Sequence, residues 1–184
     1  MILLVIGLAL LIAIHLVPAA PMVRAWCVER MGEGPYRMLF AAISILAVVL
    51  LAMGLGRAEY VPLWQAVPYG REIAPGLMAA AVLLLVAAYV PTNLRRLVDH
   101  PMLWAVTLWA VAHLLVTGHL AALLLFGGIG AYALFALLTQ RYGRRWASAE
   151  PRSLAWDAAT VVIAAALYLG LLVGHETLFG VAVL

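Results

Sequence analysis

Apolar residues fill six long runs of this chain, and short segments rich in proline, glycine and arginine separate the runs. The runs cover residues 2–20, 36–55, 73–90, 101–118, 120–139 and 157–175. An α-helix rises about 1.5 Å per residue, so about 20 apolar residues cross the hydrocarbon core of a bilayer. The pattern predicts an all-α, polytopic transmembrane bundle of about six helices that forms a single domain over residues 1–184.

Small residues and short connections predict how these helices meet. Gly118 and His119 alone connect the fourth and fifth runs, so we expect a tight antiparallel hairpin there. Gly127 and Ala131 form a small-xxx-small pair in the fifth run, which predicts a close helix contact. After Glu176 only a short apolar tail remains, too short to span again.

Composition supports a lipid environment and excludes several classes of function. The 184 residues are 67% hydrophobic and 10% charged, whereas soluble domains are about 45–50% apolar and 25% charged. The lipid bilayer is therefore the expected partner. A net charge of +3 without a basic stripe argues against nucleic-acid binding. The single cysteine, Cys27, excludes an intrachain disulfide and receives no role.

The arginines predict the orientation of the bundle. Placing the N-terminus outside puts nine arginines in the inner segments and leaves only two, Arg57 and Arg71, outside. The positive-inside rule then predicts a multi-pass protein of the bacterial inner membrane with both termini in the periplasm. The nine inner arginines are Arg24, Arg30, Arg37, Arg95, Arg96, Arg141, Arg144, Arg145 and Arg152.

Two histidines are the most informative polar residues, because ionisable groups are costly inside a bilayer and are often functional there. Of five histidines, only His15 and His113 fall within the body of apolar runs. A neutral imidazole needs a partner for each nitrogen. One interpretation is structural, with each ring bonded to a backbone carbonyl on a neighbouring helix. The other is haem b held between two helices, since paired histidines can ligate haem iron axially.

Helix geometry limits which histidines could share one iron. His100 and His113 lie on one predicted helix, roughly 20 Å apart along its axis, so they cannot ligate the same iron from opposite sides. His15 would pair with one of them. Its depth differs from that of His113 by about 10 Å, and His100 has a similar mismatch in the other direction. Depth alone does not choose between them.

Other residues add weaker indications. Trp109 lies one helical turn before His113 and suits either a haem pocket or a lipid contact. Arg95 and Arg96 suit topology control, an anionic head group or a haem propionate. The carboxylates lie in the connections or at helix ends, which counts against a proton-coupled transporter.

Several short motifs, in this order and spacing, resemble one family over nearly the whole chain. They are His15-Leu16-Val17-Pro18, Tyr36-Arg37-Met38-Leu39-Phe40 with Ser44, Leu63-Trp64, Asn93-Leu94-Arg95-Arg96, His100-Pro101-Met102-Leu103-Trp104, Leu108-Trp109-Ala110-Val111-Ala112-His113 and Leu124-Leu125-Phe126-Gly127. The sequence resembles the NnrU family of bacterial membrane proteins, whose plant relatives are the zeta-carotene isomerases.

The resemblance implies a function that composition cannot give. NnrU-like proteins are associated with denitrification and nitrogen oxides, and the plant isomerases use haem b to isomerise a carotenoid double bond. Their two haem ligands match His15 and His113 here. The isomerases carry a cysteine three residues before the second ligand, where this chain has Ala110, so a ligand switch through that cysteine is not expected.

The resulting prediction is a haem-b membrane protein with a redox, isomerase-like or sensing role in nitrogen-oxide metabolism. An apolar small molecule or NO would be its ligand, and the activity would be that of a haem-dependent isomerase or oxidoreductase. The alternative, from another class, is a membrane accessory or assembly factor in which the histidines make interhelical hydrogen bonds and no cofactor binds.

Overall fold

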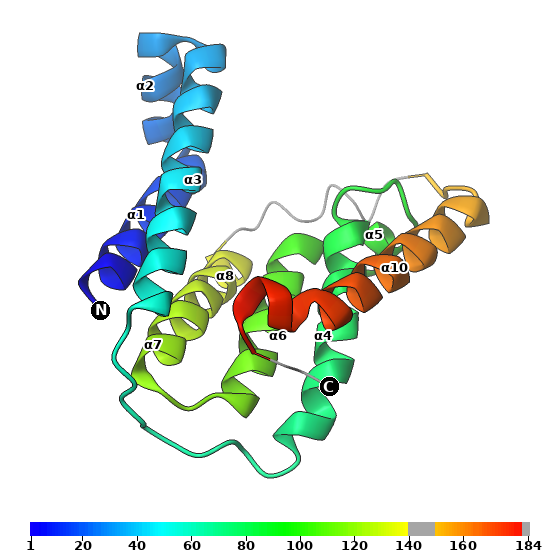
Figure 1. Cartoon of the computed structure of the whole chain (residues 1–184). Coiled ribbons are helices and arrows are strands. Elements are labelled where there is room, and N and C mark those ends of the chain that lie inside the picture. The colour runs from blue at the N-terminus through cyan, green and yellow to red at the C-terminus, as the bar shows by residue number, and fades with distance from the viewer. Residues whose placement is uncertain (140–149, 182–184) are drawn as a thin grey trace.

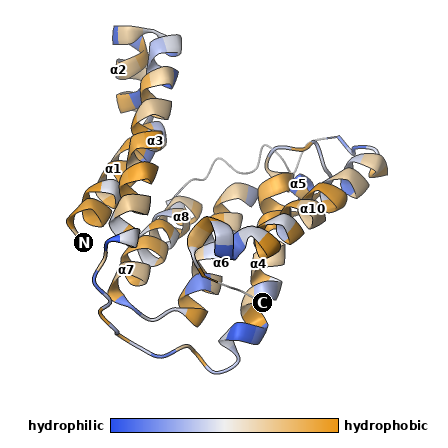
Figure 2. Ribbon diagram, in the orientation of Figure 1, coloured by the Kyte–Doolittle hydropathy of each residue, from blue (hydrophilic) through white to orange (hydrophobic). Residues whose placement is uncertain are grey.

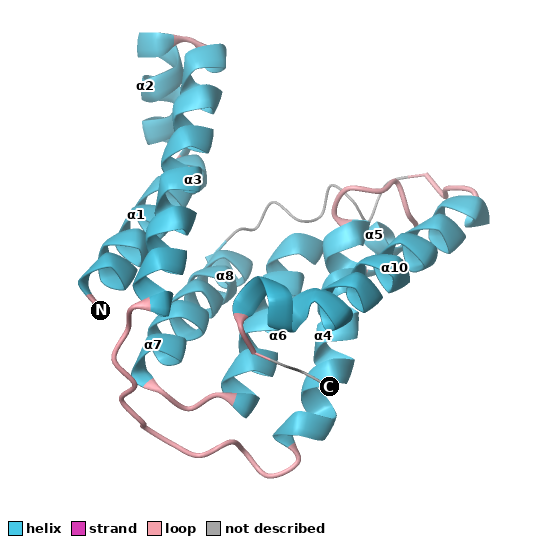
Figure 3. Ribbon diagram, viewed as in Figure 1, coloured by secondary structure: helices cyan, strands magenta, loops and turns pink. Residues whose placement is uncertain are grey.

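A computed structural model describes residues 1–139 and 150–181, and this part of the chain is predominantly helical (Figures 1 and 3). The prediction of an all-α bundle is confirmed. The long helices are α1 (Ile2–Ala19), α3 (Glu33–Gly56), α4 (Gly70–Ala87), α6 (Pro101–Val116), α8 (Gly128–Thr139) and α10 (Leu154–Phe179). Shorter elements are α2 (Pro21–Met31), α5 (Leu94–Leu97), α7 (Leu120–Ala122) and the π-helical turn η1 (Leu123–Gly127). Three of the predicted inner arginines, Arg141, Arg144 and Arg145, lie outside the described residues.

All six apolar runs are helical, as predicted, and five of these segments are long and apolar enough to cross a membrane. These are α1, α3, α4, the continuous α7–η1–α8 segment and α10. Helix α6 has 16 residues, about 24 Å of rise, and is shorter than a typical span. Figure 2 shows these helices mostly in apolar colours and the polar residues mainly in the connections.

Helix α2 was not expected, because the sequence suggested only a connection between the first two runs. Pro21 begins this helix, and Gly32, with a φ of 86°, ends it in a conformation that favours glycine. Arg24 and Arg37 both form ion pairs with Glu33 at 2.9 Å. The Arg24 pair joins α2 to the first turn of α3, whereas the Arg37 pair lies within α3 itself. Helix α2 thus packs beside the start of α3, at one end of the α1–α3 hairpin (Figure 1).

The C-terminal helix also extends beyond its predicted limits. The Ser153 hydroxyl accepts a hydrogen bond from the Ala155 amide and caps the start of α10. The helix continues past Glu176 to Phe179 and ends at Gly180, which adopts the left-handed conformation typical of a helix C-terminus. The start of the predicted short tail is therefore the last turn of α10.

The helices pack side by side in the order α3, α1, η1–α8, α6, α4 and α10. Small residues allow the closest contacts, as is usual between membrane helices. A Cβ atom at Gly54 of α3 would lie 2.3 Å from the Leu4 amide nitrogen of α1. A Cβ atom at Gly130 of α8 would lie 2.7 Å from Ala110 Cβ of α6. This order places η1–α8 between α1 and α6, the two helices that carry the intramembrane histidines.

The prediction of a close helix contact through Gly127 and Ala131 was wrong. The segment does pack closely against its neighbours, but through other residues. Among the described residues, a Cβ atom at Gly127 would meet only Leu123 of the same π-helical turn, while Gly128 faces Leu8 of α1. Ala131 is exposed. The π-helical turn that ends at Gly127 has more residues per turn than an α-helix. It therefore changes which of the following residues face the neighbouring helices.

A polar cluster anchors α10, which packs on α4 at the edge of the bundle. The Asp157 carboxylate accepts hydrogen bonds from the Thr92 hydroxyl, the Asn93 amide nitrogen at 2.8 Å and the Asn93 side chain at 2.7 Å. Asn93 also exchanges hydrogen bonds with the Arg152 backbone. These contacts tie the segment between α4 and α5 to the start of α10.

Candidate functional site

His15 lies in the last turns of α1, half-buried against α3 and α8. Its Nδ1 atom is 2.8 Å from the Leu11 carbonyl oxygen. A carbonyl only accepts, so Nδ1 carries the hydrogen, and in the neutral ring Nε2 keeps its lone pair. The ring lies near Phe40 and Tyr132, with centroid separations of 5.2 and 6.2 Å. The Tyr132 hydroxyl donates to the His15 carbonyl at 2.9 Å, which fixes α8 against the end of α1.

His113 lies in the last turns of α6 in a matching arrangement. Its Nδ1 atom is 2.8 Å from the Trp109 carbonyl oxygen, so its Nε2 also keeps the lone pair. The imidazole stacks on Phe126 of η1, with centroids 4.3 Å apart and an interplanar angle of 17°. Trp109 packs edge-on against the same phenyl ring at 4.8 Å. Trp109 therefore belongs to the histidine's aromatic surroundings.

The two imidazoles contact the same helical segment at different depths. His15 meets Tyr132 and His113 meets Phe126, six positions apart, which is about 9 Å along a helix. This offset agrees with the depth difference expected from the sequence. Within residues 1–139 and 150–181, no hydrogen bond or ring contact joins the two imidazoles directly. Both rings thus flank η1–α8.

His100 occupies the position before α6 and has an unusual backbone conformation. Its φ of 54° is positive, which is uncommon for a residue with a side chain, although histidine adopts it more often than most. Its Nε2 atom is buried and has no hydrogen-bond partner within the described residues. His100 lies at the start of α6, and its role as an alternative ligand stays a prediction.

Arg95 and Arg96 differ in how they are used. The Arg95 side chain donates to the carbonyl oxygens of Ala87, at 2.6 Å, and Ala88. These carbonyls lie at the end of α4, where helix C-termini lack intrahelical donors, so Arg95 stabilises that terminus. Arg96 is exposed. An anionic head group or a haem propionate would therefore find Arg96 more accessible than Arg95.

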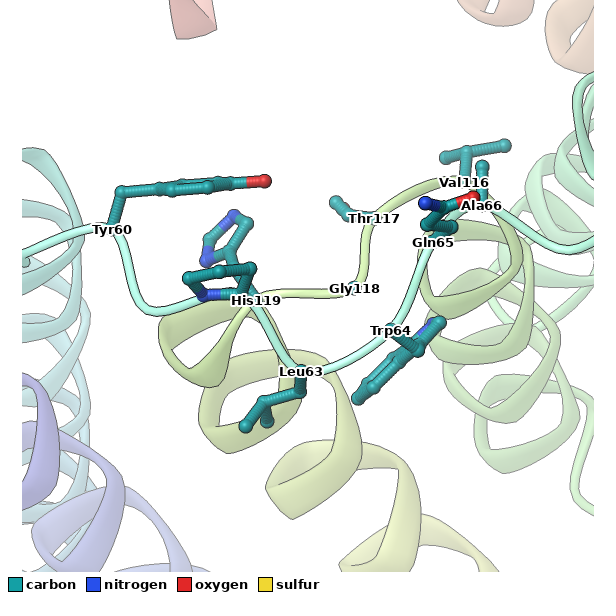
Figure 4. Close-up of a pocket in the computed structure, with 10 residues that line it drawn as sticks. Tyr60, Leu63, Trp64, Gln65, Ala66, Val116, Thr117, Gly118 and His119 are labelled. Atoms are coloured by element: carbon teal, nitrogen blue, oxygen red, sulfur yellow. The ribbon is translucent and has the colours of Figure 1, made fainter.

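Sequence reasoning missed a pocket at the end of the bundle opposite α5. The connection over residues 57–69 lies along the turn between α6 and α7 (Figure 4). The amides of Leu63 and Trp64 donate to the Gly118 carbonyl at 2.7 and 3.0 Å, and the Leu120 amide donates to Val61. A Cβ atom at Gly118 would lie 2.0 Å from the Trp64 carbonyl oxygen. Only glycine permits this close approach. Gly118 was therefore the one residue from which the sequence could have indicated a close contact at this turn.

The remaining histidines and the cysteine lie apart from the two intramembrane imidazoles. His119 Nδ1 accepts a hydrogen bond from the Ala122 amide at 3.2 Å and caps α7. His175 Nδ1 is 2.7 Å from the Val181 carbonyl near the end of α10. Cys27 is a partly exposed free thiol on α2. Within the described ranges, no three histidine, cysteine or carboxylate side chains gather as a metal-binding group.

The exposed apolar helices and their alternating direction define a multi-pass α-helical membrane protein. The chain belongs to the NnrU protein family, whose model matches residues 3–183. No curated protein and no solved structure gives a significant match to the chain.

Proposed function

We propose that this NnrU family member is a haem-b protein in which His15 and His113 supply the axial ligands. One observation supports the proposal most directly. Both intramembrane imidazoles commit Nδ1 to a carbonyl one turn earlier, which leaves Nε2 free as a lone-pair donor. Metal-bound histidines commonly have this arrangement, because the bond at Nδ1 fixes both the tautomer and the ring orientation.

The surroundings of the two rings suit an apolar, planar cofactor. Phe40 and Tyr132 flank His15, and Phe126 and Trp109 flank His113. Aromatic side chains exclude water and pack against flat ring systems. These aromatic residues and the two imidazoles would hold the group from both sides of η1–α8.

A bound haem would supply one-electron chemistry or an iron position for a small ligand. The chain's own residues would hold it, orient the ligand rings through Leu11 and Trp109, and keep water away. The proposed role is redox, isomerase-like or sensing chemistry in nitrogen-oxide metabolism, with NO or an apolar small molecule as ligand. The resemblance described above supports this role, and both termini are proposed to face the periplasm.

Absorption spectroscopy tests the proposal. Wild-type protein purified in detergent from haem-replete cells is expected to show a Soret band that shifts on reduction. The variants His15→Ala and His113→Ala should each lose most of that band. His113→Met should keep a band with a changed spectrum, because methionine also ligates haem iron. This substitution separates loss of a ligand from loss of the fold.

His175→Ala serves as the matched control, since it removes an imidazole from the last turns of α10 and should leave the Soret band intact. A colourless wild-type protein would refute the proposal. Loss of the band in His100→Ala, with the band retained in His113→Ala, would assign the second ligand to His100 instead.

A second candidate function is a membrane accessory or assembly factor without a cofactor. We expected interhelical hydrogen bonds from the histidines, and this detail is wrong, because each Nδ1 bonds to the carbonyl four residues earlier in its own helix. These bonds still favour a structural role, because each imidazole already has one partner. The Tyr132 bond to the His15 carbonyl adds a purely structural link between α1 and α8. Under this interpretation, His15→Ala and His113→Ala would lower thermal stability and change no visible spectrum.

A further inference from the structure

The pocket beside the α6–α7 turn has the size and polarity of a ligand site. It measures about 630 Å³, within the range of about 300–1,000 Å³ typical of small-molecule sites. Figure 4 shows Tyr60 and His119 at one end, Gln65 and Ala66 at the other, and Thr117 between them. The backbone bonds described above hold the connection over residues 57–69 against the turn, so the pocket is part of the fold.

One end of the pocket presents two hydrogen-bond donors. His119 Nδ1 accepts from the Ala122 amide, so Nε2 of the neutral ring carries the hydrogen. The Tyr60 ring lies 5.4 Å from the His119 ring and is 73% exposed, which leaves its hydroxyl available. This end therefore favours a group that accepts hydrogen bonds.

Thr117, between the two ends, has an unused hydroxyl. Its Oγ1 atom is buried and without a hydrogen-bond partner in the described part of the chain, although the residue lines the pocket. A buried hydroxyl without a partner is costly. A change of χ1 by roughly 120°, from one staggered rotamer to the next, would move the hydroxyl to another position around Cβ. A ligand acceptor in the pocket would then pair with the Thr117 hydroxyl. The Gln65 side-chain amide is a second donor for an acceptor at its own end of the pocket.

The position and charge of the pocket restrict the class of ligand that it can bind. None of its described lining residues is Asp, Glu, Lys or Arg, which favours a neutral ligand over a phosphate. It lies where α6 ends and α7 begins, at the level where apolar helices give way to a polar connection. A ligand that reaches this level from the bilayer would combine a polar head with an apolar tail.

We propose that this pocket binds the head group of a membrane quinone, with one ring carbonyl accepting from Tyr60 and His119 and the other from Thr117 or Gln65. Figure 4 shows the Trp64 indole on the other side of the connection, and it donates to the Leu114 carbonyl. The flat ring would therefore lie between the two donor ends of the pocket, and the isoprenoid tail would leave toward the bilayer. Binding at this pocket does not depend on haem, so the two proposals can fail separately.

Quenching of tryptophan fluorescence by decylubiquinone measures this binding in detergent. Wild-type protein should show saturable quenching. Tyr60→Phe removes one hydroxyl and keeps the ring. His119→Asn keeps a side chain that caps helices well but removes the Nε2 donor. Thr117→Val removes the hydroxyl at nearly constant shape. Each substitution should weaken binding about 2- to 10-fold, as expected for one lost hydrogen bond.

Tyr69→Phe is the matched control, because it removes an exposed tyrosine hydroxyl from the same connection at a residue that does not line the pocket. It should bind like the wild type. Thermal unfolding without quinone separates binding from folding. Thr117→Val should be at least as stable as the wild type, since the removed hydroxyl has no partner in the part of the chain that the structure describes.

Three results would overturn the proposal. The first is quenching that does not saturate, or that equals the quenching of free tryptophan in empty micelles. The second is wild-type affinity in Tyr60→Phe, His119→Asn and Thr117→Val alike. The third is displacement of the quinone by dioleoylphosphatidylglycerol with the same dependence on these variants, which would assign the pocket to a lipid head group.

Discussion

The contact between α1 and α3 at Gly54 allows a sharp test of the fold. Replacing Gly54 by alanine would place a Cβ atom 2.3 Å from the Leu4 amide nitrogen and 2.6 Å from Leu4 Cα. Both are backbone atoms of a fully buried residue, so no side-chain rotation relieves the clash. Ordinary van der Waals contact begins at 3.4 Å, which means that the two helices must separate locally by about 1 Å.

The magnitude follows from two opposing effects. Alanine favours a helix over glycine by about 1 kcal/mol, whereas overpacking of a close contact costs about 1–3 kcal/mol and occasionally more. Gly56 separates the two effects, because a Cβ atom there would meet no atom of the described residues within 4 Å. We expect Gly56→Ala to be neutral or stabilising. Gly54→Ala should be less stable than Gly56→Ala by about 1–3 kcal/mol.

Thermal unfolding in detergent, followed by circular dichroism, measures the difference. For a chain of this size, 1 kcal/mol shifts the melting temperature by about 2–4 °C, so the two variants should differ by roughly 2–12 °C. Equal melting temperatures for Gly54→Ala and Gly56→Ala would refute the close approach of α1 and α3. A larger loss in Gly56→Ala would contradict the assignment of the contact face.

Two further predictions concern α10 and topology. Asp157→Ala leaves Thr92 and Asn93 without their shared acceptor, so protease cleavage near the start of α10 should accelerate. The control variant Glu176→Ala, changed at the other end of the helix, should be cleaved at the wild-type rate. Equal cleavage rates in the two variants would argue against the anchoring role of Asp157. Alkaline phosphatase fused after Leu184 should be active, as expected for a periplasmic C-terminus, whereas activity only at a fusion in the segment between α8 and α10 would reverse the orientation.

The candidate site shows how far sequence reasoning reaches. His15 and His113 stand out because an imidazole in an apolar run is rare and costly. Their depth difference also follows from helix rise alone. The bonds from Nδ1 to Leu11 and Trp109, which set the tautomer, connect residues four positions apart on one helix. Local geometry of this kind is available to sequence reasoning once the helix is recognised.

The pocket residues could not be grouped from sequence. Tyr60 and His119 are 59 positions apart and meet only because the 57–69 connection lies along the α6–α7 turn. Each residue alone matches the ordinary composition of a membrane interface, where aromatic side chains are common. The two residues lie in one pocket because backbone hydrogen bonds join segments that are distant in the sequence. The periodicity of apolar residues gives no information about such bonds.

The sequence by itself determined the solvent, the class and the positions of the spanning helices, because a bilayer requires long apolar helices and their number can be counted. It also singled out the two intramembrane histidines. The tertiary structure decided which helices are neighbours, that η1–α8 lies against both histidines, and that Gly128 and Gly130 make the contacts first expected of Gly127 and Ala131. These features depend on how one surface fits another, and a π-helical turn of five residues is enough to change the fit.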